Sequence, residues 1–326
     1  MARAILFAVG EAGSAEYLVP LWRRWLEKPP EVSWRVAASP VARKRIAAAK
    51  LRGLPLVAGD IETASALADR LGNWKPDLVV ASASHAAVEA AAIALARKLG
   101  LTIIRFVDTW YGYRDRLSEE AALDLPDRLL VIDESAVEQA VGEGLPRDIL
   151  APVGQPAWEQ VVALPPADPR RVTFVSQPIA RNYGTSLGYT ETSSWNLLLE
   201  TALRRPDLIA ELVFAPHPDD DMPPPAEDRL VRVARGQDSL KNSGTVVGMF
   251  SSLMIEALLA GRRVVSLQPG ATGPDRGNMS RRGFVTRATS AEELVAALDA
   301  LPPDLAELRA ALKGSCERLE RALLAS

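Results

Sequence analysis

The sequence predicts an α/β protein of two domains that face a cleft, each built on a parallel sheet with crossover helices. Along the first half, short runs rich in β-branched residues alternate with longer amphipathic runs, as in strands joined by helices. The alternation stops at a proline-rich stretch, residues 151–170, and then begins again. A chain of 326 residues is long enough for two cores, because one domain commonly takes about 150 residues. We therefore expect one domain over residues 1–160 and another over residues 161–326.

Six strands are expected in the first domain. They are Ala4–Val9, Ser33–Ala38, Leu54–Val57, Leu78–Ala81, Thr102–Val107 and Leu129–Ile132. Ser14–Leu26 carries its apolar residues on one stripe, and Ala86–Leu99 is rich in alanine with its charges on one side, so both are expected to be helices. A third helix should begin at Asp133 or Ser135 and end near Gly142, where residues typical of helix starts and ends occur.

The second domain is expected to repeat this pattern. Its expected strands are Val172–Val175, Leu212–Ala215, Leu230–Val233, Val246–Met249 and Val264–Leu267, and its expected helices are Ser194–Arg204, Ser252–Leu259 and Ala291–Leu301. A last amphipathic helix, residues 304–324, either packs on the second sheet or crosses back to the first domain. Ligands of such Rossmann-like sheets bind beyond the carboxyl ends of the strands, so functional residues are expected in the loops that follow the strands.

Composition excludes several classes of function. Lys and Arg total 38 against 41 Asp and Glu, so the net charge of −3 provides no positive field for nucleic acid. The one cysteine, Cys316, cannot form an internal disulfide, and the start lacks a secretion leader, so a reducing cytoplasm is expected. The longest apolar run, Leu78–Leu95, is interrupted by polar residues and is too short to span a membrane. His85 and His217 are the only histidines and lie in no ligand cluster, so neither a zinc site nor another cofactor is expected.

The segment VVGMFSSLMIEALLAGRRVVSL carries the most specific signal. A buried strand ends at Phe250, and a helix begins directly after Ser251 and Ser252, which can cap it. The unpaired N–H groups at such a helix start attract anions such as phosphate. Glu256 lies one turn further along the same side, where its carboxylate could accept hydrogen bonds from ribose hydroxyls. The alternative is an ordinary serine cap followed by a good helix former.

This segment, read as a strand followed by S-S-x-x-x-E-A-L-x-x-G-R-x-V-V, resembles the nucleotide-binding element in the C-terminal domain of the GT-B superfamily. That superfamily holds glycosyltransferases and UDP-N-acetylglucosamine 2-epimerases. VFAPHP, Val213 to Pro218, resembles the strand and His-Pro pair of bacterial members, including sialyltransferases and glycerophosphotransferases. In those families the histidine contacts the nucleotide phosphate or sugar, which the resemblance implies for His217. Gly154–Pro156 resembles the G-x-P element that precedes the crossover between the two domains.

A loop after the fifth expected strand, RFVDTWYGYRDRL, gathers aromatic and charged residues that suit a sugar. Trp110 and Tyr113 could cover the apolar side of a pyranose ring, and Arg114 could hold a carboxylate or phosphate. The alternative is that the two aromatic rings anchor a lid or an interdomain surface. In the loop after the first strand, Gly10 and Gly13 lack side chains and could let the backbone approach the acceptor or sugar.

An inverting transfer needs a base that takes a proton from the acceptor hydroxyl, and a carboxylate or imidazole of the first domain is the usual choice. Asp108 is the first candidate, His85 the second and Glu11 the third. In the second domain, helix N–H groups and His217 would stabilise the departing nucleotide. Gln177, after the first strand of that domain, is a further candidate for nucleotide binding, although the glycines common at this point in the superfamily are absent.

Together these features predict a metal-independent glycosyltransferase that uses a nucleotide sugar in the synthesis of bacterial surface polysaccharide or glycoconjugate. Its partners would be the nucleotide-sugar donor and a carbohydrate or lipid-linked acceptor. We expect a cytoplasmic enzyme, for which peripheral contact with the inner face of the membrane and the oligomeric state are both open.

Two alternatives stay open. One is a sugar-nucleotide 2-epimerase of the same fold, although its usual His-x-Glu-Ala-Gly element is replaced here by Val-Asp-Thr-Trp-Tyr-Gly, residues 107–112. The other is a non-catalytic subunit that binds a nucleotide sugar. Asp219-x-Asp221 is similar to the metal-binding Asp-x-Asp of the other glycosyltransferase fold, but a solvated acidic loop explains it.

Overall fold

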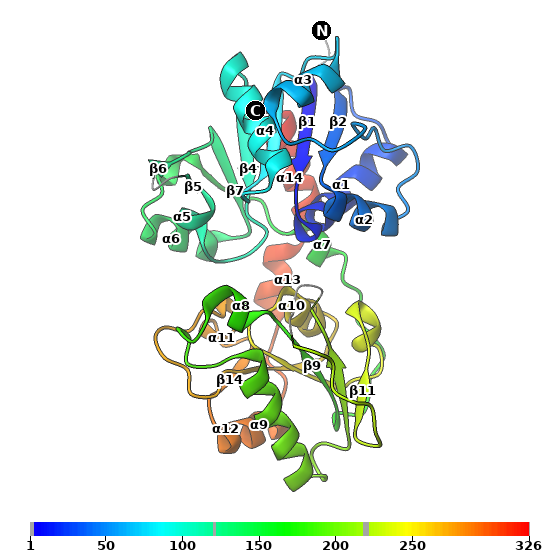
Figure 1. Cartoon of the computed structure of the whole chain (residues 1–326), viewed down its shortest axis with the longest axis vertical. Coiled ribbons are helices and arrows are strands. Elements are labelled where there is room, and N and C mark those ends of the chain that lie inside the picture. The colour runs from blue at the N-terminus through cyan, green and yellow to red at the C-terminus, as the bar shows by residue number, and fades with distance from the viewer. Residues whose placement is uncertain (1–2, 120–121, 218–221, 326) are drawn as a thin grey trace. The chain divides into compact units, whose positions relative to one another are not determined.

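The computed structural model describes residues 3–119, 122–217 and 222–325 (Figure 1). The chain forms two compact units. Unit 1 comprises Met1–Gln160 together with Arg309–Ser326, and unit 2 comprises Val161–Leu308. Unit 2 is therefore inserted, in sequence, between two segments of unit 1.

Unit 1 contains a six-stranded parallel sheet in the order β2-β1-β3-β4-β7-β8. Its strands are β1 (Ala4–Val9), β2 (Ser33–Ala38), β3 (Leu78–Ser82), β4 (Thr102–Phe106), β7 (Arg128–Val131) and β8 (Leu150–Pro152). The expected strand Leu54–Val57 is reduced to an isolated bridge between Leu56 and Val36 at the outer edge of β2. Pro55 has no N–H to donate, which limits the pairing of that segment. Strand β8 was not expected from the sequence.

Helices cover both faces of the unit 1 sheet. They are α1 (Ala12–Glu27), α2 (Pro40–Ala48), α3 (Ala64–Leu71), α4 (Ala87–Leu99), α5 (Tyr113–Arg116), α6 (Glu134–Gly142), α7 (Pro156–Glu159) and α14 (Ser315–Leu324), and a small hairpin is formed by β5 (Ser118–Glu119) and β6 (Ala122–Leu123). On one face, Phe7 packs with Trp22, Trp25 and the apolar side of α14. On the other face, α3 and α4 pack against β1, β3 and β4. The alternate side chains of each strand therefore fill two cores.

The expected helix over residues 304–324 is in fact two helices, α13 (Ala306–Leu312) and α14, separated at Gly314, which has a φ of 75°. Helix α14 packs against α1 and α7 in unit 1 (Figure 1, red). Gly154 permits this approach, because a Cβ there would lie 1.9 Å from the hydroxyl oxygen of Ser315. Glu159 accepts a hydrogen bond from the main-chain N–H of Cys316 at 2.9 Å and so caps the start of α14.

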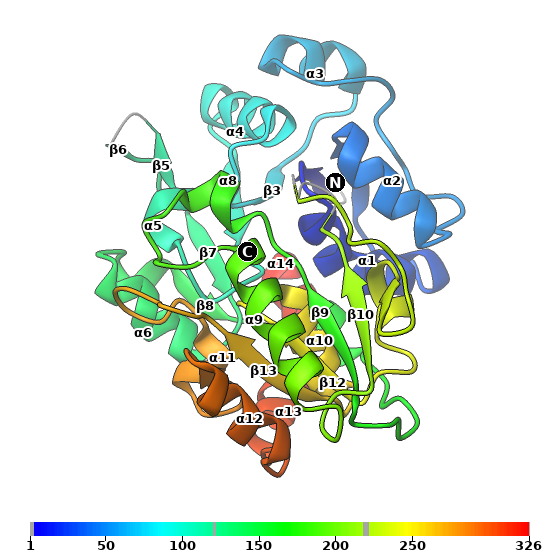
Figure 2. The same cartoon turned by 60° about the horizontal axis from the view of Figure 1, so that its bottom comes forward.

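Unit 2 contains a second six-stranded parallel sheet, in the order β11-β10-β9-β12-β13-β14. Its strands are β9 (Arg171–Val175), β10 (Glu211–Ala215), β11 (Val231–Val233), β12 (Thr245–Gly248), β13 (Arg263–Leu267) and β14 (Thr286–Ala288). Its helices are α8 (Ile179–Tyr183), α9 (Glu191–Arg204), α10 (Ser252–Leu259), α11 (Asn278–Arg281) and α12 (Ala291–Asp299). Helices α9 and α12 pack side by side over the same core (Figure 2). The expected strands and the expected helix Ser252–Leu259 are found, whereas β14 was not expected.

The unit 2 sheet has the strand order of a Rossmann domain, and the unit 1 sheet has the same order when the bridged segment at Leu56 is counted as the outer strand beside β2. The expectation of two Rossmann-like domains is therefore confirmed. In such a sheet the direction of winding reverses between the first strand and the strand that begins the second half. That reversal lies between β1 and β3 in unit 1 and between β9 and β12 in unit 2. Crevices open at the carboxyl ends of these strands, which is where ligands of the fold bind.

Candidate functional site

In unit 1, a buried glutamate joins the loops that follow β1 and β3. Glu89, on α4, is 0% exposed and accepts hydrogen bonds from the main-chain N–H of Gly10 at 3.0 Å and from the hydroxyls of Ser82 and Ser84. Gly10 is required here, because a Cβ would lie 2.1 Å from the Cβ of Ala86. The two loops at the reversal point are thereby held in one arrangement around a carboxylate.

Burial raises the pKa of Glu89, and its bonds from Ser82, Ser84 and Gly10 only partly oppose that rise. The folded protein therefore binds this proton more tightly than the unfolded chain. Protonated Glu89 therefore stabilises the fold below pH 4.5, the ordinary pKa of a glutamate side chain. This stabilisation is lost as pH rises through the raised pKa. We expect the melting temperature of the wild type, relative to Glu89→Gln, to fall as pH rises from about 4.5 to 8.

Thermal melts of both proteins across that range measure the difference. Glu138→Gln removes an exposed carboxylate on α6 and serves as the control. A wild-type advantage that is constant with pH would contradict a raised pKa for Glu89.

Beside this cluster lies a second acidic group, Asp108, in the loop after β4. Its carboxylate approaches the first turn of α1, since a Cβ on Gly13 would lie 2.9 Å from Asp108 Oδ2. Burial raises the pKa of Asp108, and the neighbouring Arg116 opposes the rise. Burial disfavours the charged guanidinium of Arg116, but Asp108, Tyr111 and Glu11 outweigh it and raise its pKa. The structure thus brings Asp108, Glu11 and Gly13 together in unit 1.

The other expected base is placed differently. His85 is exposed, and its Nε2 lies 3.1 Å from the main-chain oxygen of Asp115. Ser14, the first residue of the expected helix, is buried within α1 and donates to the Ser82 hydroxyl at 2.8 Å. Helix α1 begins at Ala12, and Glu11 occupies the cap position without a side-chain cap bond. Glu11 is exposed there, near the positive end of the helix.

The aromatic residues of this loop do not form the expected sugar-binding surface. Trp110 is 2% exposed, donates its Nε1–H to Asp133 Oδ1 at 2.9 Å, and stacks on Trp158 with ring centroids 5.0 Å apart. Tyr113 is 0% exposed. Both rings pack into the interior of unit 1, where they anchor this segment. Arg114 is exposed and is held by Glu143, whose Oε2 accepts its main-chain N–H at 2.8 Å.

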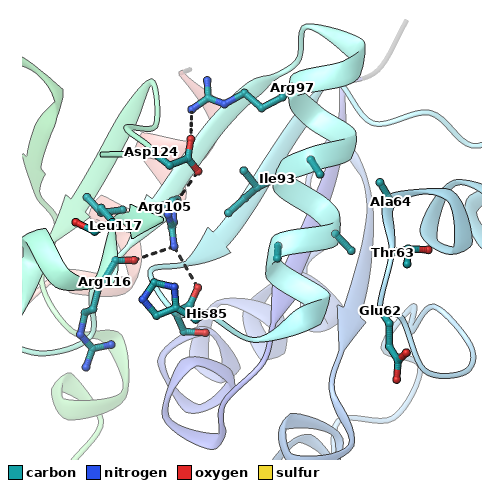
Figure 3. A pocket seen from close by; sticks show the side chains of 15 residues that line it. Glu62, Thr63, Ala64, His85, Ile93, Arg97, Arg105, Arg116, Leu117 and Asp124 are labelled. Atoms are coloured by element: carbon teal, nitrogen blue, oxygen red, sulfur yellow. Dashed lines mark hydrogen bonds and ion pairs between the residues drawn. The ribbon is translucent and has the colours of Figure 1, made fainter. Parts of the chain in front are cut away.

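A cavity of about 460 Å³ adjoins these groups within unit 1 (Figure 3). It extends from the start of α3 across α4 to β4 and the end of α5, where Arg116 lies. Ser84, His85 and Arg116 line it, so it borders the acidic cluster. Arg105, on β4, also lines it, although its side chain is only 5% exposed.

Sequence reasoning did not single out Glu89 or Arg105. Each is a charge inside an apolar run: Glu89 in an alanine-rich helix and Arg105 in the strand TIIRF. Burial of a charge is costly unless it is paired, so such a residue is a signal for a built polar site. Side chains alternate between the two faces of a strand, and Arg105 lies on the same face of β4 as the core residue Ile103. This position is a second indication that the charge of Arg105 is buried.

In unit 2, the expected serine loop has the expected geometry. Ser251 is the N-cap of α10 and accepts the main-chain N–H of Leu253 at 3.3 Å, whereas Ser252 is exposed in the first turn. Glu256 is half-buried one turn further along. Gly248 lets the helix pack closely on its strand, because a Cβ there would lie 2.8 Å from the sulfur of Met254.

Gln177 joins this loop to the loop after β9. Its Oε1 accepts the main-chain N–H of Phe250 at 2.8 Å, directly before the capping serine. Unit 2 therefore resembles unit 1 in one respect. In each unit, one side chain forms hydrogen bonds that join the loops after the two strands between which the winding reverses. This hydrogen bond places Gln177 beside Ser251 and Ser252, the other residues that the sequence suggests for nucleotide binding.

His217 lies two residues after β10 and is half-buried. Because β9 is the one strand between β10 and β12, the carboxyl ends of β10 and β12 are about 10 Å apart. His217 and the start of α10 therefore lie at the same edge of one sheet. Asp219 and Asp221, which follow, lie outside the described residues.

An aromatic group that the sequence did not indicate borders the same edge. Tyr183 contacts Phe250 with ring centroids 6.2 Å apart, and the guanidinium of Arg276 lies 4.7 Å from the centroid of the Tyr183 ring. These side chains come from loops after β9, β12 and β13, whose carboxyl ends are neighbours in the sheet. A half-buried ring beside a cation could stack on a nucleobase.

Within the described ranges, no cluster of three or more His, Cys, Asp or Glu side chains could hold a metal ion. Likewise, none of the helices in the part of the chain that the structure describes is long and apolar enough to cross a membrane. Cys316 is buried, and burial raises its pKa to about 11, which makes it a poor nucleophile.

No family model matches the chain, and no curated protein matches it. Solved structures do. The UDP-GlcNAc 2-epimerase of Neisseria meningitidis, solved with UDP-GlcNAc bound, is 13% identical and matches 99% of this chain and 100% of its own with a TM-score of 0.67. The UDP-GlcNAc 2-epimerase of Methanocaldococcus jannaschii is also 13% identical over 99% and 100% of the two chains, with a TM-score of 0.65. The glycosyltransferase of kitacinnamycin is 17% identical over 98% and 95%, with a TM-score of 0.61.

The chain therefore has the GT-B fold over its whole length, which confirms the resemblance at the level of the fold. Of eight similar solved structures, five are described as UDP-GlcNAc 2-epimerases and two as glycosyltransferases. The comparisons thus support the sequence-based alternative better than the expected glycosyltransferase.

Proposed function

We propose that this protein is an enzyme that acts on a nucleotide sugar, with nucleotide-binding groups in unit 2 and proton-transferring carboxylates in unit 1. The observation that carries the proposal is the environment of Asp108. It is a carboxylate whose pKa is raised by burial, lies beside Arg116, and follows a strand next to the reversal point of a Rossmann sheet. Groups with shifted pKa values at such positions are typical of sites that transfer protons.

The nucleotide side of the proposal rests on the start of α10. Ser252 is exposed in the first turn of α10, where the main-chain N–H groups and the helix dipole favour a negative charge. Gln177 fixes the preceding residue, so the N–H groups are held in place before a ligand arrives. His217, at the same edge of the sheet, would bind the other side of a phosphate or the sugar. Glu256 would accept the ribose hydroxyls.

On the sugar side, Asp108 in its ionised form can take a proton and in its protonated form can give one back. Arg116 keeps the ionised form accessible, since it lowers the raised pKa of its neighbour. Glu11 is exposed next to Arg116 and provides a second carboxylate. Two acidic groups around one guanidinium can serve a reaction in which one proton leaves a carbon or oxygen and another is delivered.

The first candidate reaction is 2-epimerisation of a UDP-sugar. Inversion at C2 requires the C2–H bond to break and to form again on the opposite face, so it needs proton donors and acceptors around the sugar. The pair Glu11 and Asp108 supports it, and so does the likeness to UDP-GlcNAc 2-epimerases over the whole chain. This order reverses the one expected from the sequence alone.

Glycosyl transfer to a carbohydrate or lipid-linked acceptor is the second candidate. The loop after β4 favours it, because residues 107–112 read Val-Asp-Thr-Trp-Tyr-Gly in place of the His-x-Glu-Ala-Gly of the epimerases. In that reaction Asp108 would take the proton of the acceptor hydroxyl, and unit 2 would stabilise the departing nucleotide.

A thermal-shift series with UDP, CDP, CMP, GDP and their sugars tests the class of enzyme. A ligand at one hundred times its Kd adds about 2.7 kcal/mol to the free energy of unfolding, which is readily measured. No shift with any of these nucleotides would overturn the proposal.

Incubation with UDP-GlcNAc in D₂O then separates the two reactions. An epimerase exchanges the C2 proton, so NMR should show deuterium at C2 of recovered nucleotide sugar. A glycosyltransferase leaves C2–H intact and releases UDP only with an acceptor present.

A further inference from the structure

A hydrogen bond leads from the buried carboxyl of Glu89 to the cavity of unit 1. The Ser84 hydroxyl donates to Glu89 Oε2 and forms part of the cavity wall, although Ser84 is only 8% exposed. Glu89 itself is 0% exposed and does not line the cavity. Exposed His85 lines it as well, so the cavity opens to solvent. Of the described residues that are hydrogen-bonded to Glu89, Ser84 is the one that reaches the cavity.

The remaining hydrogen bonds hold the other oxygen of this carboxyl from the interior. Gly10 donates its main-chain N–H to Glu89 Oε1 at 3.0 Å, and the Ser82 hydroxyl donates to the same oxygen. Ser82 accepts the hydroxyl of Ser14 at 2.8 Å, which directs its own proton toward Oε1. Ser14 and Ser82 are both buried. Any exchange of a proton with the cavity therefore has to pass through Oε2 and Ser84.

Ser84 is held in place for such a transfer. Its Oγ accepts the main-chain N–H of Ala86 at 3.3 Å, and its carbonyl accepts Arg105 Nη2 at 3.2 Å. A hydroxyl has one proton to give and two lone pairs to accept others. When Glu89 is protonated, its O–H can donate to Ser84 Oγ, and the Ser84 proton is then free to turn toward the cavity.

The rest of the cavity suits an uncharged ligand. Asp124 lies between the guanidinium groups of Arg97 and Arg105 (Figure 3). Asp108 lies beside Arg116. These cations therefore have carboxylate partners within the protein. The outward face of α4 contributes exposed alanines, and the volume of about 460 Å³ is within the usual range for small ligands, roughly 300 to 1,000 Å³. A sugar ring combines CH groups for this apolar face with hydroxyls for Ser84.

We propose that Ser84 and Glu89 form a proton relay that serves a sugar bound in the cavity. In the step, the O–H bond of Ser84 breaks as its proton passes to a sugar oxygen that gains negative charge during the reaction. Ser84 Oγ takes the proton of Glu89 at the same time. Glu89 is left ionised, with the N–H of Gly10 and the hydroxyl of Ser82 on its Oε1. After the product leaves, Glu89 regains a proton from solvent through the same hydroxyl.

The surroundings of the relay support this direction of transfer. Burial raises the pKa of Glu89, and the carboxylate of Glu11 at the start of α1 adds to the rise, so Glu89 holds its proton more tightly than an exposed glutamate does. Arg116 Nη1 donates to the carbonyl of Ala83, next to Ser84, at 3.3 Å, and Arg116 also neighbours Asp108. The role toward the sugar rests on the proposed function, whereas the passage of a proton from Glu89 to the cavity does not.

Infrared spectroscopy of the full chain tests that passage without any substrate. The carbonyl band of a protonated carboxyl, taken as the difference between the wild type and Glu89→Gln, reports the proton on Glu89. After a jump to a pH at which this band is lost, it should disappear more slowly in Ser84→Ala than in the wild type. Ser82→Ala removes a bond from the other oxygen of the same carboxyl and should keep the wild-type rate. Equal rates in the wild type and Ser84→Ala, or no such band at neutral pH, would overturn the relay.

Turnover of UDP-GlcNAc tests the role toward the sugar. Ser84→Ala should lower kcat about a hundredfold or more, the contribution of a general acid, with KM little changed. Ser84→Thr keeps the hydroxyl and should recover most of the lost kcat. Ser65→Ala removes an exposed hydroxyl of α3 that does not line the cavity and is the control for both.

The two measurements separate the relay from the proposed function. Melting curves of each variant establish that it folds. If the wild type turns over no nucleotide sugar while the infrared rates differ as expected, the proposed function is wrong and the relay stands without it. If the wild type is active and Ser84→Ala has a normal kcat, the relay does not serve the reaction and the proposed function is unaffected.

Discussion

Asparagine in place of Asp108 is expected to lower kcat by about two to four orders of magnitude, the usual contribution of a general acid or base. The amide has nearly the shape of the carboxylate and can lie next to Gly13 and Arg116, so the fold should be retained. It cannot take a proton at neutral pH. Nucleotide binding should be unchanged, because unit 2 carries the proposed nucleotide site.

Steady-state kinetics and a UDP titration of Asp108→Asn measure the two effects separately. Asp115→Asn removes an exposed carboxylate from the same loop and should leave kcat unaltered. If Asp108 acts as the base, kcat/KM of the wild type should increase as pH rises through its raised pKa, above the ordinary value of 3.8. Normal turnover of Asp108→Asn would remove the central residue of the proposal.

Aspartate in place of Ser252 is expected to separate nucleotide binding from stability. A carboxylate in the first turn of a helix interacts favourably with the helix dipole, by about 0.3 to 1 kcal/mol, so α10 should be slightly stabilised. The same charge lies where the proposal places the diphosphate. Repulsion in partly screened surroundings should weaken UDP binding about ten- to a hundredfold.

Titration with UDP and melting curves of Ser252→Asp test both halves of this expectation. Val41→Glu adds an acid to the first turn of α2 in unit 1, where none is present, and controls for the general effect of the helix dipole. It should raise the melting temperature without any loss of nucleotide affinity. Unchanged UDP affinity in Ser252→Asp would show that the nucleotide binds away from α10.

Much of the fold could be predicted because buried parallel strands form short apolar runs with few competing interpretations. Ala4–Val9, Ser33–Ala38 and Ser252–Leu259 were expected with the bounds that the structure shows. Strand β8 was missed because Leu150–Pro152 is three residues long and ends in proline, in the stretch interpreted as a linker. Strand β14 was missed because Thr286–Ala288 is equally short and contains an arginine. Strands of this length are specified by their neighbours in the sheet more than by their own sequence.

The site was predictable to the extent that local chemistry defines it. A serine cap is a local signal, and Ser251 occupies that position as expected. The burial of Trp110 was not predictable, because an aromatic ring among charges has the same sequence pattern whether it faces a ligand or the core. Glu89 was missed for the opposite reason. Its partner Gly10 lies 79 positions away in the sequence, and only the folded sheet brings the two together.

The inserted position of unit 2 has a consequence for biosynthesis. The core of unit 1 includes Leu319 and Leu323, both 0% exposed, which follow unit 2 in the sequence and therefore leave the ribosome after it. Unit 2 is complete in sequence at Leu308, before that happens. During translation, the second sheet can therefore fold while the core of the first still lacks the apolar side chains of α14. A nascent chain stalled before α14 would expose Trp22 and Trp25, which share that core.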